Sequence, residues 1–408
     1  MATVLMLAHR LPYPPNKGDK IHTYQLLKSL ASRHKVLLGT FVDDPDDEQY
    51  VPKVREMCAE LHVSRLDRRS AKLRALGGLA DGRPLSVAFY RDAALAGWVQ
   101  RQREARRADV LFVYSSSMLQ YAEDFDLPMA IDFADVDSAK WAEYARRHGF
   151  PMSWVYRREA AKLLGVERRF AARARWSLFA TEKEAQLFRE LAPESADRSG
   201  VLGNGVDAEF FTPDPARPSP FPEGEIPVVF MGAMDYWPNV DAVTWFAAEA
   251  LPQLRQRWPT LRFHIVGRSP APAVQALQSD AVNVTGTVPD VRAYVQHAAV
   301  VVAPLRLARG IQNKVLEAMA MARPVVAATS CVASMDVTAG EHALAAETAA
   351  DYAREVAALI ENRERAAAIG RAGRQRVIDV YGWDARLSRM DEFLGIASAA
   401  PALEAQGA

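Results

Sequence analysis

The residues most able to do chemistry lie in the stretch AVVVAPLRLARGIQNKVLEAMAMARPVVAAT, which covers residues 299–329. The pattern predicts a buried strand, a basic loop with Arg309 and Gly310, a helix that begins near Asn313, and a second buried strand. The free backbone N–H groups and partial positive charge at the start of a helix bind anions. Lys314, in the first turn, adds a cation. The loop and the helix start therefore predict a site for a diphosphate.

Glu317 lies one turn further along the same predicted helix, on the face that carries Asn313 and Lys314. An ionised carboxylate is only an acceptor and can take hydrogen bonds from two hydroxyl groups, so it suits the paired hydroxyls of a ribose. Cations followed by a carboxylate therefore favour a nucleotide sugar as the ligand. The alternative is an ordinary strand–helix–strand unit whose helix faces solvent, and only the structural context of the motif separates the two.

A second group of chemically active residues follows the predicted strand at residues 129–133. The chain reads IDFADVDSAKW there, with carboxylates at Asp132, Asp135 and Asp137. Three carboxylates at the end of a strand are costly to bury and do not serve packing. Asp135 is the candidate base or positioning group for an acceptor hydroxyl, and Asp137 is the alternative. Metal binding by the D-x-D pair is the competing interpretation.

Strands that alternate with helices must position these residues, and the apolar pattern predicts such an alternation along nearly the whole chain. The predicted elements include residues 4–8, 20–32, 35–41, 48–61, 62–66, 110–114, 129–133, 154–175, 178–180, 181–191, 228–231, 241–256, 262–266, 283–285 and 291–297. This rhythm is typical of an open parallel sheet with helices on both faces, so the predicted fold class is α/β.

The rhythm restarts after the proline-rich segment 212–225, and 408 residues exceed the size of one ordinary domain. We predict two Rossmann-like, doubly wound domains at 1–200 and 201–375, a terminal helix at 376–396 that returns to the first domain, and a disordered tail at 397–408. Such domains in tandem bind a ligand between them, at the carboxyl ends of the strands. No G-x-G-x-x-G follows the first strand, which argues against a dinucleotide-dependent dehydrogenase.

Composition narrows the class of protein further. Half of the residues are hydrophobic, a quarter are charged and the formal net charge is zero, which is ordinary for a soluble globular protein and does not suggest a nucleic-acid partner. Two cysteines, Cys58 and Cys331, make no disulfide framework and agree with a reducing cytoplasm. No signal peptide or membrane-spanning run is evident. Basic residues gather between 65 and 107 and between 157 and 175, where they either face solvent or meet anionic lipid at the inner membrane.

The segment LEAMAMARPVVA, which includes Glu317, resembles the donor-site signature of family 4 glycosyltransferases. The resemblance implies the GT-B fold, in which two Rossmann-like domains face each other across a cleft, and it gives Glu317 the place of the second glutamate in the signature. The first glutamate would fall on Arg309. The family's arginine and lysine on the donor diphosphate would fall on Ala233 and Pro238. Both cations are therefore missing, and Arg309 and Lys314 are expected to neutralise the diphosphate instead.

Three turns at predicted strand ends resemble the donor-binding turns of the same family. Gly232 ends VVFMG, where the missing side chain lets a phosphate approach the backbone. Gly267 ends FHIVG, although an ordinary strand-to-loop glycine explains it equally well. The segment GTVPD resembles the turn whose backbone, around Val288, reads the nucleobase.

Two further fragments resemble parts of the family outside these turns. NKGD, with Lys17 and Gly18, resembles the glycine loop that lies over the donor phosphates and the acceptor, and a proline-rich turn without function is the alternative. LGNGVD resembles the opening of the second domain near the hinge. That resemblance makes Asn204 and Gly205 hinge or cleft residues, and a tight turn is the alternative.

The spelling DFADVDSAKW resembles a subgroup of sugar transferases linked to exopolysaccharide and exosortase (PEP-CTERM) loci, and this resemblance extends over most of the chain. It implies transfer, with retention at the anomeric carbon, from a nucleotide-diphosphate sugar to a glycan or to a polyprenyl-diphosphate-linked acceptor in the cytoplasm. Enzymes with this fold neutralise the leaving diphosphate with cations and helix dipoles. No metal and no further cofactor are therefore expected.

Two other functions fit the same sequence. Loss of the first glutamate and of the usual arginine and lysine fits a catalytically inactive subunit that binds a nucleotide sugar and organises a polysaccharide assembly complex. Turnover separates that subunit from an enzyme. A nucleotide-sugar epimerase has the same two-domain architecture, and it would release the nucleoside diphosphate without any acceptor, whereas a transferase should release little until acceptor is added.

Overall fold

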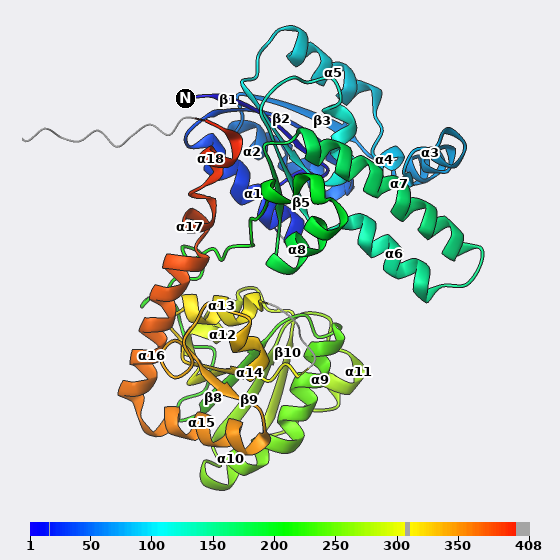
Figure 1. Ribbon diagram of the computed structural model, residues 1–408. Coiled ribbons are helices and arrows are strands. Elements are labelled where there is room, and N and C mark those ends of the chain that lie inside the picture. The colour runs from blue at the N-terminus through cyan, green and yellow to red at the C-terminus, as the bar shows by residue number, and fades with distance from the viewer. Residues whose placement is uncertain (16, 307–310, 397–408) are drawn as a thin grey trace, which may run out of the picture. The chain divides into compact units, whose positions relative to one another are not determined.

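The computed structural model describes residues 1–15, 17–306 and 311–396, and within them the chain forms two compact units (Figure 1). Unit 1 comprises Met1–Asn204 together with the described residues from Arg386 onward, and unit 2 comprises Gly205–Ala385. Each unit has its own sheet and its own hydrophobic core.

Unit 1 is built on a sheet of seven parallel strands in the order β3-β2-β1-β4-β5-β6-β7. The strands are β1 (Thr3–Ala8), β2 (Lys35–Val42), β3 (Glu60–Arg65), β4 (Val110–Tyr114), β5 (Met129–Ala134), β6 (Trp176–Phe179) and β7 (Ser199–Val201). The central strands are continuous apolar runs, TVLMLA in β1 and VLFVY in β4, as expected for strands that are buried on both faces.

Helices cover both faces of this sheet (Figure 1). They are α1 (Gly18–Ala31), α2 (Val51–Glu56), α3 (Arg68–Asp81), α4 (Leu85–Phe89), α5 (Ala93–Glu104), α6 (Asp137–Arg147), α7 (Met152–Arg173) and α8 (Glu182–Leu191). The core beneath α8 contains three phenylalanine rings, because the Phe179 ring lies 5.5 Å from that of Phe133 and 4.9 Å from that of Phe188.

Unit 2 repeats the design with six parallel strands in the order β10-β9-β8-β11-β12-β13. The strands are β8 (Ile226–Met231), β9 (Leu261–Val266), β10 (Val282–Gly286), β11 (Val300–Ala303), β12 (Val325–Ala328) and β13 (Leu344–Ala346). The helices are α9 (Trp237–Trp245), α10 (Leu251–Arg257), α11 (Pro272–Gln275), α12 (Val291–His297), α13 (Asn313–Ala320), α14 (Thr329–Ala333), α15 (Ala349–Glu361) and α16 (Arg363–Arg376). The order of the strands in both sheets reverses beside the first strand of the unit, which is the topology of a doubly wound fold.

The last described residues return to unit 1. After α16 the chain passes through the short helix α17 (Trp383–Leu387) to α18 (Met390–Leu394), which packs near β4 and β5. The Phe393 ring meets the Trp176 ring edge-on at 5.3 Å. Asp391 accepts hydrogen bonds from His34 Nε2 at 3.1 Å and pairs with Arg33 at 2.9 Å. Unit 1 is therefore assembled from two separate parts of the chain.

Several regions differ from the pattern-based expectation, among them two in unit 1. The helix expected at 48–61 is a 3₁₀ turn at Pro45–Tyr50 followed by the short helix α2, and Glu60 and Leu61 belong to β3, where they pair with β2. Backbone hydrogen bonding explains this difference, because Glu60 and Leu61 pair with β2 as part of a parallel strand and so cannot belong to a helix. The structure also contains α3, α4 and α5 between residues 66 and 110, where no element was expected.

A helix can cross a membrane only if it is both long enough and apolar enough. Among the residues that the structure describes, no helix is long and apolar enough to cross a bilayer.

Candidate functional site

In unit 2 the candidate site forms where α13 begins. Asn313 is the first residue of the helix, Lys314 follows in the first turn, and Glu317 lies one turn further on. The Lys314 ammonium group donates a hydrogen bond to Asn239 Oδ1 and lies 4.7 Å from the centre of the Phe230 ring. The structure thus places a cation at the start of this helix with a carboxylate one turn behind it.

Burial disfavours both charges of this pair. It lowers the pKa of Lys314 to about 8, although the Glu317 carboxylate opposes that change. It also raises the pKa of Glu317 to about 7, which the Lys314 charge opposes in turn. A buried charge is costly unless a partner compensates it, so an anionic ligand beside Lys314 would recover part of the cost. The site therefore favours a ligand with negative charge.

Gly232, directly after β8, lies next to the Lys314 ammonium group. A Cβ atom on Gly232 would lie 3.2 Å from Lys314 Nζ and 2.8 Å from Asn239 Nδ2, and Gly232 has a φ of +157°. Any larger residue would crowd the lysine out of this position. Asn239 completes the arrangement, because its Nδ2 donates to the Ala233 carbonyl at 2.8 Å. Asn239 did not stand out in the sequence, since it lies within an ordinary helix start.

Gly267, at the end of β9, has a purely structural reason to be glycine. A Cβ atom on it would lie 1.7 Å from the Gly232 carbonyl oxygen, so the two strand ends can approach only without a side chain there. Val288 is half-buried and packs against the core of unit 2 from the loop after β10. The Val288 side chain is apolar and makes no hydrogen bond or ion pair with Lys314 or Glu317.

The basic loop before α13 is described only in part. Arg309 and Gly310, both predicted as site residues, lie outside the described residues. Arg306 is described, and its guanidinium pairs with Asp241 at 2.7 Å and lies 5.3 Å from the centre of the Trp245 ring. Arg306 is thus engaged by α9 in this structure.

In unit 1 three aspartates lie in β5 or just after it, and they have different surroundings. Asp132 is fully buried, and its Oδ2 lies 2.6 Å from His22 Nε2. Asp135 and Asp137 are partly exposed, and both accept from Lys140 Nζ, at 2.7 and 3.2 Å. The structure therefore separates a fully buried aspartate from a partly buried pair, as the spacing alone could not show.

Burial raises the pKa of Asp137, and the nearby Lys140 ammonium opposes that shift. A carboxylate with a raised pKa is a stronger base, which suits removal of a proton from a hydroxyl group. The turn that carries Asp137 is held by carboxylates of other helices. Glu184 accepts from the Val136 backbone N–H at 2.8 Å, and buried Glu167 accepts from Ser138.

Two histidines reach the same edge of the sheet although no histidine follows β5 in the sequence. His22, on α1, is buried between Asp132 and Asn204, whose Oδ1 lies 2.8 Å from His22 Nδ1. Burial alone would lower the pKa of His22, but the Asp132 carboxylate outweighs it and holds the pKa above its ordinary value. Asn204, predicted as a hinge or cleft residue, is itself exposed and contacts the buried His22 of unit 1.

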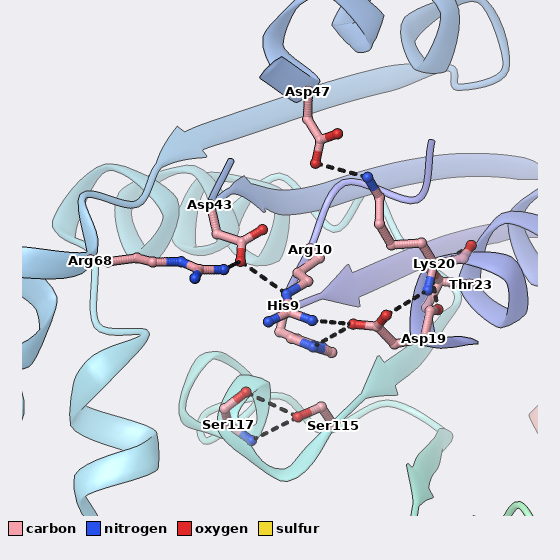
Figure 2. A network of polar contacts seen from close by, with 10 residues as sticks. All are labelled: His9, Arg10, Asp19, Lys20, Thr23, Asp43, Asp47, Arg68, Ser115 and Ser117. Carbon is pink, nitrogen blue, oxygen red and sulfur yellow. Dashed lines mark hydrogen bonds and ion pairs between the residues drawn. The ribbon is translucent and has the colours of Figure 1, made fainter. Parts of the chain in front are cut away.

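His9 follows β1 and belongs to the polar network in Figure 2. Its ring stacks on Tyr114 at 5.6 Å, and its Nε2 lies 3.4 Å from Asp19. Asp19 also pairs with Arg10 at 2.6 Å, and Arg10 in turn reaches Asp43 at 3.0 Å. Burial would raise the pKa of Asp19, but His9 and Arg10 outweigh it and lower the pKa. The network fixes the start of α1 to β1.

The predicted glycine loop lies at that helix start. Lys17 and Gly18 are exposed, and a Cβ atom on Gly18 would meet no other atom within 4 Å. Open space there leaves room for a ligand but does not require glycine. Gly205, in contrast, is tightly packed within unit 2, because a Cβ atom on it would lie 2.7 Å from the Trp383 ring.

Metal-ion chemistry was the competing interpretation of Asp135 and Asp137. Across residues 1–15, 17–306 and 311–396, no group of three or more histidine, cysteine, aspartate or glutamate side chains is arranged to hold a metal ion. Their recorded partner is Lys140.

Comparison with solved structures places the whole chain in one fold. HepE of Anabaena, solved with UDP, aligns with a TM-score of 0.64 at 16% identity and covers 97% of this chain and 100% of its own. The sucrose-phosphate synthase of Thermosynechococcus elongatus gives 0.62 at 16% identity, with 96% and 98% covered. WaaG, a glycosyltransferase involved in lipopolysaccharide biosynthesis, gives 0.59 at 16% identity, with 96% and 100% covered. No protein with a curated description matches the sequence.

These likenesses and the two parallel sheets define the GT-B fold, and the α/β class with two Rossmann-like sheets is confirmed. Residues 225–362 match the family model described as "Glycosyl transferases group 1". The matched stretch lies within unit 2 and includes Lys314 and Glu317.

Proposed function

We propose that the chain transfers a sugar from a nucleotide-diphosphate donor bound in unit 2 to a hydroxyl group of a glycan or a lipid-linked acceptor. One observation carries the proposal. The Lys314 ammonium group lies beside Gly232 at the start of α13, with Glu317 one turn further along the helix. HepE, which shares the fold, has been solved with UDP and with UDP-glucose, which supports a nucleotide-sugar donor here.

In this proposal the diphosphate and the ribose of the donor are bound by different groups of unit 2. Lys314 and the backbone N–H groups at Asn313 take the diphosphate, with Arg309 and Gly310 in the preceding loop. Gly232 lets a phosphate approach the end of β8. Glu317 accepts hydrogen bonds from the ribose hydroxyls, as an ionised carboxylate can.

Bond cleavage at the anomeric carbon leaves negative charge on the departing diphosphate. Groups that stabilise this charge in the transition state supply most of the acceleration, and Lys314 with the start of α13 has that role. Asp135 or Asp137 receives or orients the proton of the acceptor hydroxyl. We further propose retention at the anomeric carbon, with the leaving phosphate as a second proton acceptor.

The finer assignment rests on the N-terminal resemblance. The segment around DFADVDSAKW supports a role in exopolysaccharide or cell-envelope polysaccharide synthesis, within the subgroup linked to exosortase (PEP-CTERM) loci. A polyprenyl-diphosphate-linked acceptor would place the reaction at the cytoplasmic face of the inner membrane. Lys17 and Gly18, exposed at the start of α1, are the proposed contacts of unit 1 with acceptor or phosphate.

Thermal unfolding with UDP, GDP, ADP, CDP and dTDP tests the donor site. A ligand at about 100 times its dissociation constant adds roughly 2.7 kcal/mol to the stability of the folded state. We expect one nucleotide to raise the melting temperature of the wild type and of Glu347→Ala, an exposed-glutamate control in unit 2, but not of Glu317→Ala. Failure of every nucleotide to shift the wild type would refute the proposal.

Turnover decides between the transferase and its alternatives. The catalytically inactive subunit is favoured by Ala233 and Pro238, which stand where the family has its two cations. Nucleotide binding without sugar transfer to any acceptor would identify that subunit. Release of the nucleoside diphosphate from a nucleotide sugar without acceptor would instead identify an epimerase.

A further inference from the structure

Exposed hydrophobic side chains are concentrated in one part of unit 1. Apart from Met1, every large hydrophobic side chain that is exposed in the described part of unit 1 lies on α3 or on the hairpin formed by α6 and α7. Leu73 is 71% exposed, Phe150 is 85% exposed and Trp154 is 52% exposed. Single exposed apolar residues are ordinary, whereas a cluster marks an interaction surface.

On α3 the exposed residues share one side of the helix. Leu73, Leu76 and Leu79 are spaced by three, so they follow one another along the helix surface. The opposite side provides the attachment, because Ala71 and Gly78 are buried. The helix is thus anchored by small residues while its leucines face outward.

The α6–α7 hairpin presents aromatic residues at its tip. Phe150 and Met152 are exposed at the turn, and Trp154 is exposed in the first turn of α7. Behind them the Tyr144 ring lies 5.7 Å from that of Trp141. Amphipathic aromatic rings of this kind are enriched where protein meets the headgroup region of a bilayer.

Hydrogen bonds join the hairpin to the end of α3. Arg158, one turn after Trp154 on α7, donates to the Gly78 carbonyl at 2.6 Å and to the Arg83 carbonyl at 3.1 Å. The neighbouring buried Glu159 accepts from the backbone N–H of Leu85 at 2.6 Å. The two elements therefore form one surface, which projects from the sheet in Figure 1.

The charge of this surface is positive. Arg69, Lys72 and Arg74 are exposed on α3, and no acidic residue occurs between residues 68 and 80. On the hairpin, Arg157 and Lys162 are exposed as well. The carboxylates of the hairpin are engaged within the protein, since Glu143 pairs with Arg147 and Glu159 is buried.

We propose that this α3–hairpin surface, defined by Leu73, Leu76, Leu79, Phe150, Met152 and Trp154 with the basic residues around them, docks on an anionic lipid bilayer. Leucine and aromatic side chains enter the boundary between headgroups and acyl chains, while arginine and lysine contact lipid phosphates. The inference deepens the proposed function, on whose lipid-linked acceptor its purpose rests, but the docking itself is independent of the donor site.

Co-sedimentation of the full chain with vesicles tests the proposal. The vesicles contain either phosphatidylcholine alone or phosphatidylcholine with phosphatidylglycerol. We expect binding to the anionic vesicles only, and weaker binding at high salt. Leu73→Ser/Leu76→Ser should weaken it about tenfold or more, since each leucine loses burial. Arg69→Glu/Lys72→Glu should weaken it comparably.

Matched changes in unit 2 provide the controls. Ile378→Ser removes an exposed hydrophobic side chain, and Arg363→Glu/Arg371→Glu reverses two exposed charges. Both should bind vesicles as the wild type does. Melting temperatures, together with the nucleotide-induced shift, verify that every variant is folded and that the donor site is intact, so failure of docking and failure of the proposed function are distinguishable.

Three results would overturn the proposal. The wild type does not bind anionic vesicles, or the α3 variants bind them as tightly as the wild type does. Alternatively, the lipid-free wild type is a dimer in analytical ultracentrifugation and Leu73→Ser/Leu76→Ser is a monomer, which would make this surface an interface between copies of the chain.

Discussion

Lys314 and Glu317 titrate on either side of the range in which both would be charged. The pKa of Glu317 is raised to about 7, so its carboxylate is protonated below that pH, and the pKa of Lys314 is lowered to about 8, so its ammonium charge is lost above it. We expect donor affinity to be greatest between these values. Calorimetric titration with the nucleotide from about pH 6 to about pH 9 measures this dependence.

Two variants show which residue causes each decline in donor affinity. Glu317→Gln should lose the decline at low pH and keep the decline at high pH, because only the lysine still titrates. Lys314→Ala should bind weakly throughout. An affinity that stays constant across the range in the wild type would contradict the assignment of both charges to the donor.

Buried Glu167 should make stability depend on pH. Burial raises its pKa to about 7, above the ordinary 4.5, although hydrogen bonds from Ser138 and Ser116 oppose the shift. A carboxyl group with a raised folded-state pKa stabilises the fold below its unfolded pKa, and this contribution is lost as pH rises through the folded value. We expect the unfolding free energy of the wild type to fall relative to Glu167→Gln by up to about 3 kcal/mol between about pH 4.5 and pH 7.

Urea denaturation at several pH values measures this difference, and Glu347→Gln, at an exposed position, is the control. Parallel pH profiles for the wild type and Glu167→Gln would show that the group titrates normally. The result matters for the site because Glu167 holds Ser138, next to Asp137.

The sequence predicts the relation of Asn313, Lys314 and Glu317 because all three belong to one short helix, whose period fixes their common face. It does not predict the pair of His22 and Asp132, which are 110 positions apart in the chain. Contacts of that kind depend on the order of strands in the sheet, which no local pattern encodes.

At the scale of elements, the ends of β8 and β9 approach closely beside the proposed donor site. Gly267→Ala would place a Cβ atom 1.7 Å from the Gly232 carbonyl oxygen. We expect the backbone to shift, at a cost of about 1–3 kcal/mol or more, and nucleotide binding to weaken. Gly165→Ala on α7, where no atom lies within 4 Å of the added Cβ, should be neutral or stabilising. Denaturant unfolding compares the two, and equal effects would contradict the packing argument.

Elements were predictable where burial imposes a pattern. The strands β1 and β4 are continuous apolar runs, and their positions follow from that alone. α3 was not predictable, because Leu73, Leu76 and Leu79 face outward and the core-facing side carries only small residues such as Ala71. Hydrophobic periodicity predicts a helix by the side that faces the core. It does not identify a helix whose hydrophobic side chains point toward solvent.

At the scale of the whole molecule, the proposed function assigns donor and acceptor chemistry to different units. Asp137→Asn should therefore leave the nucleotide-induced thermal shift unchanged and lower sugar transfer about 100-fold or more, because a base of unit 1 is lost. A second variant, Lys140→Met, keeps Asp137 and removes the lysine that pairs with it. Loss of nucleotide binding in Asp137→Asn would contradict the division of labour.

Hydrogen exchange followed by mass spectrometry tests the same division without an acceptor. The bound nucleotide should slow exchange most in peptides that contain the start of α13 and the end of β8. In Glu317→Ala at the same nucleotide concentration the effect should vanish. Slower exchange confined to β1 and β5 of unit 1 would place the nucleotide in the wrong unit.

The return of the chain to unit 1 has a consequence for its synthesis. The helix α18, which packs near β4 and β5 and brings Phe393 against Trp176, is translated only after all of Gly205–Ala385. A nascent chain that has just passed Asn204 therefore lacks a part of its first unit, whereas unit 2 is complete once Ala385 has left the ribosome. A ribosome that stalls within unit 2 would release a first unit in which Trp176 lacks its contact with Phe393.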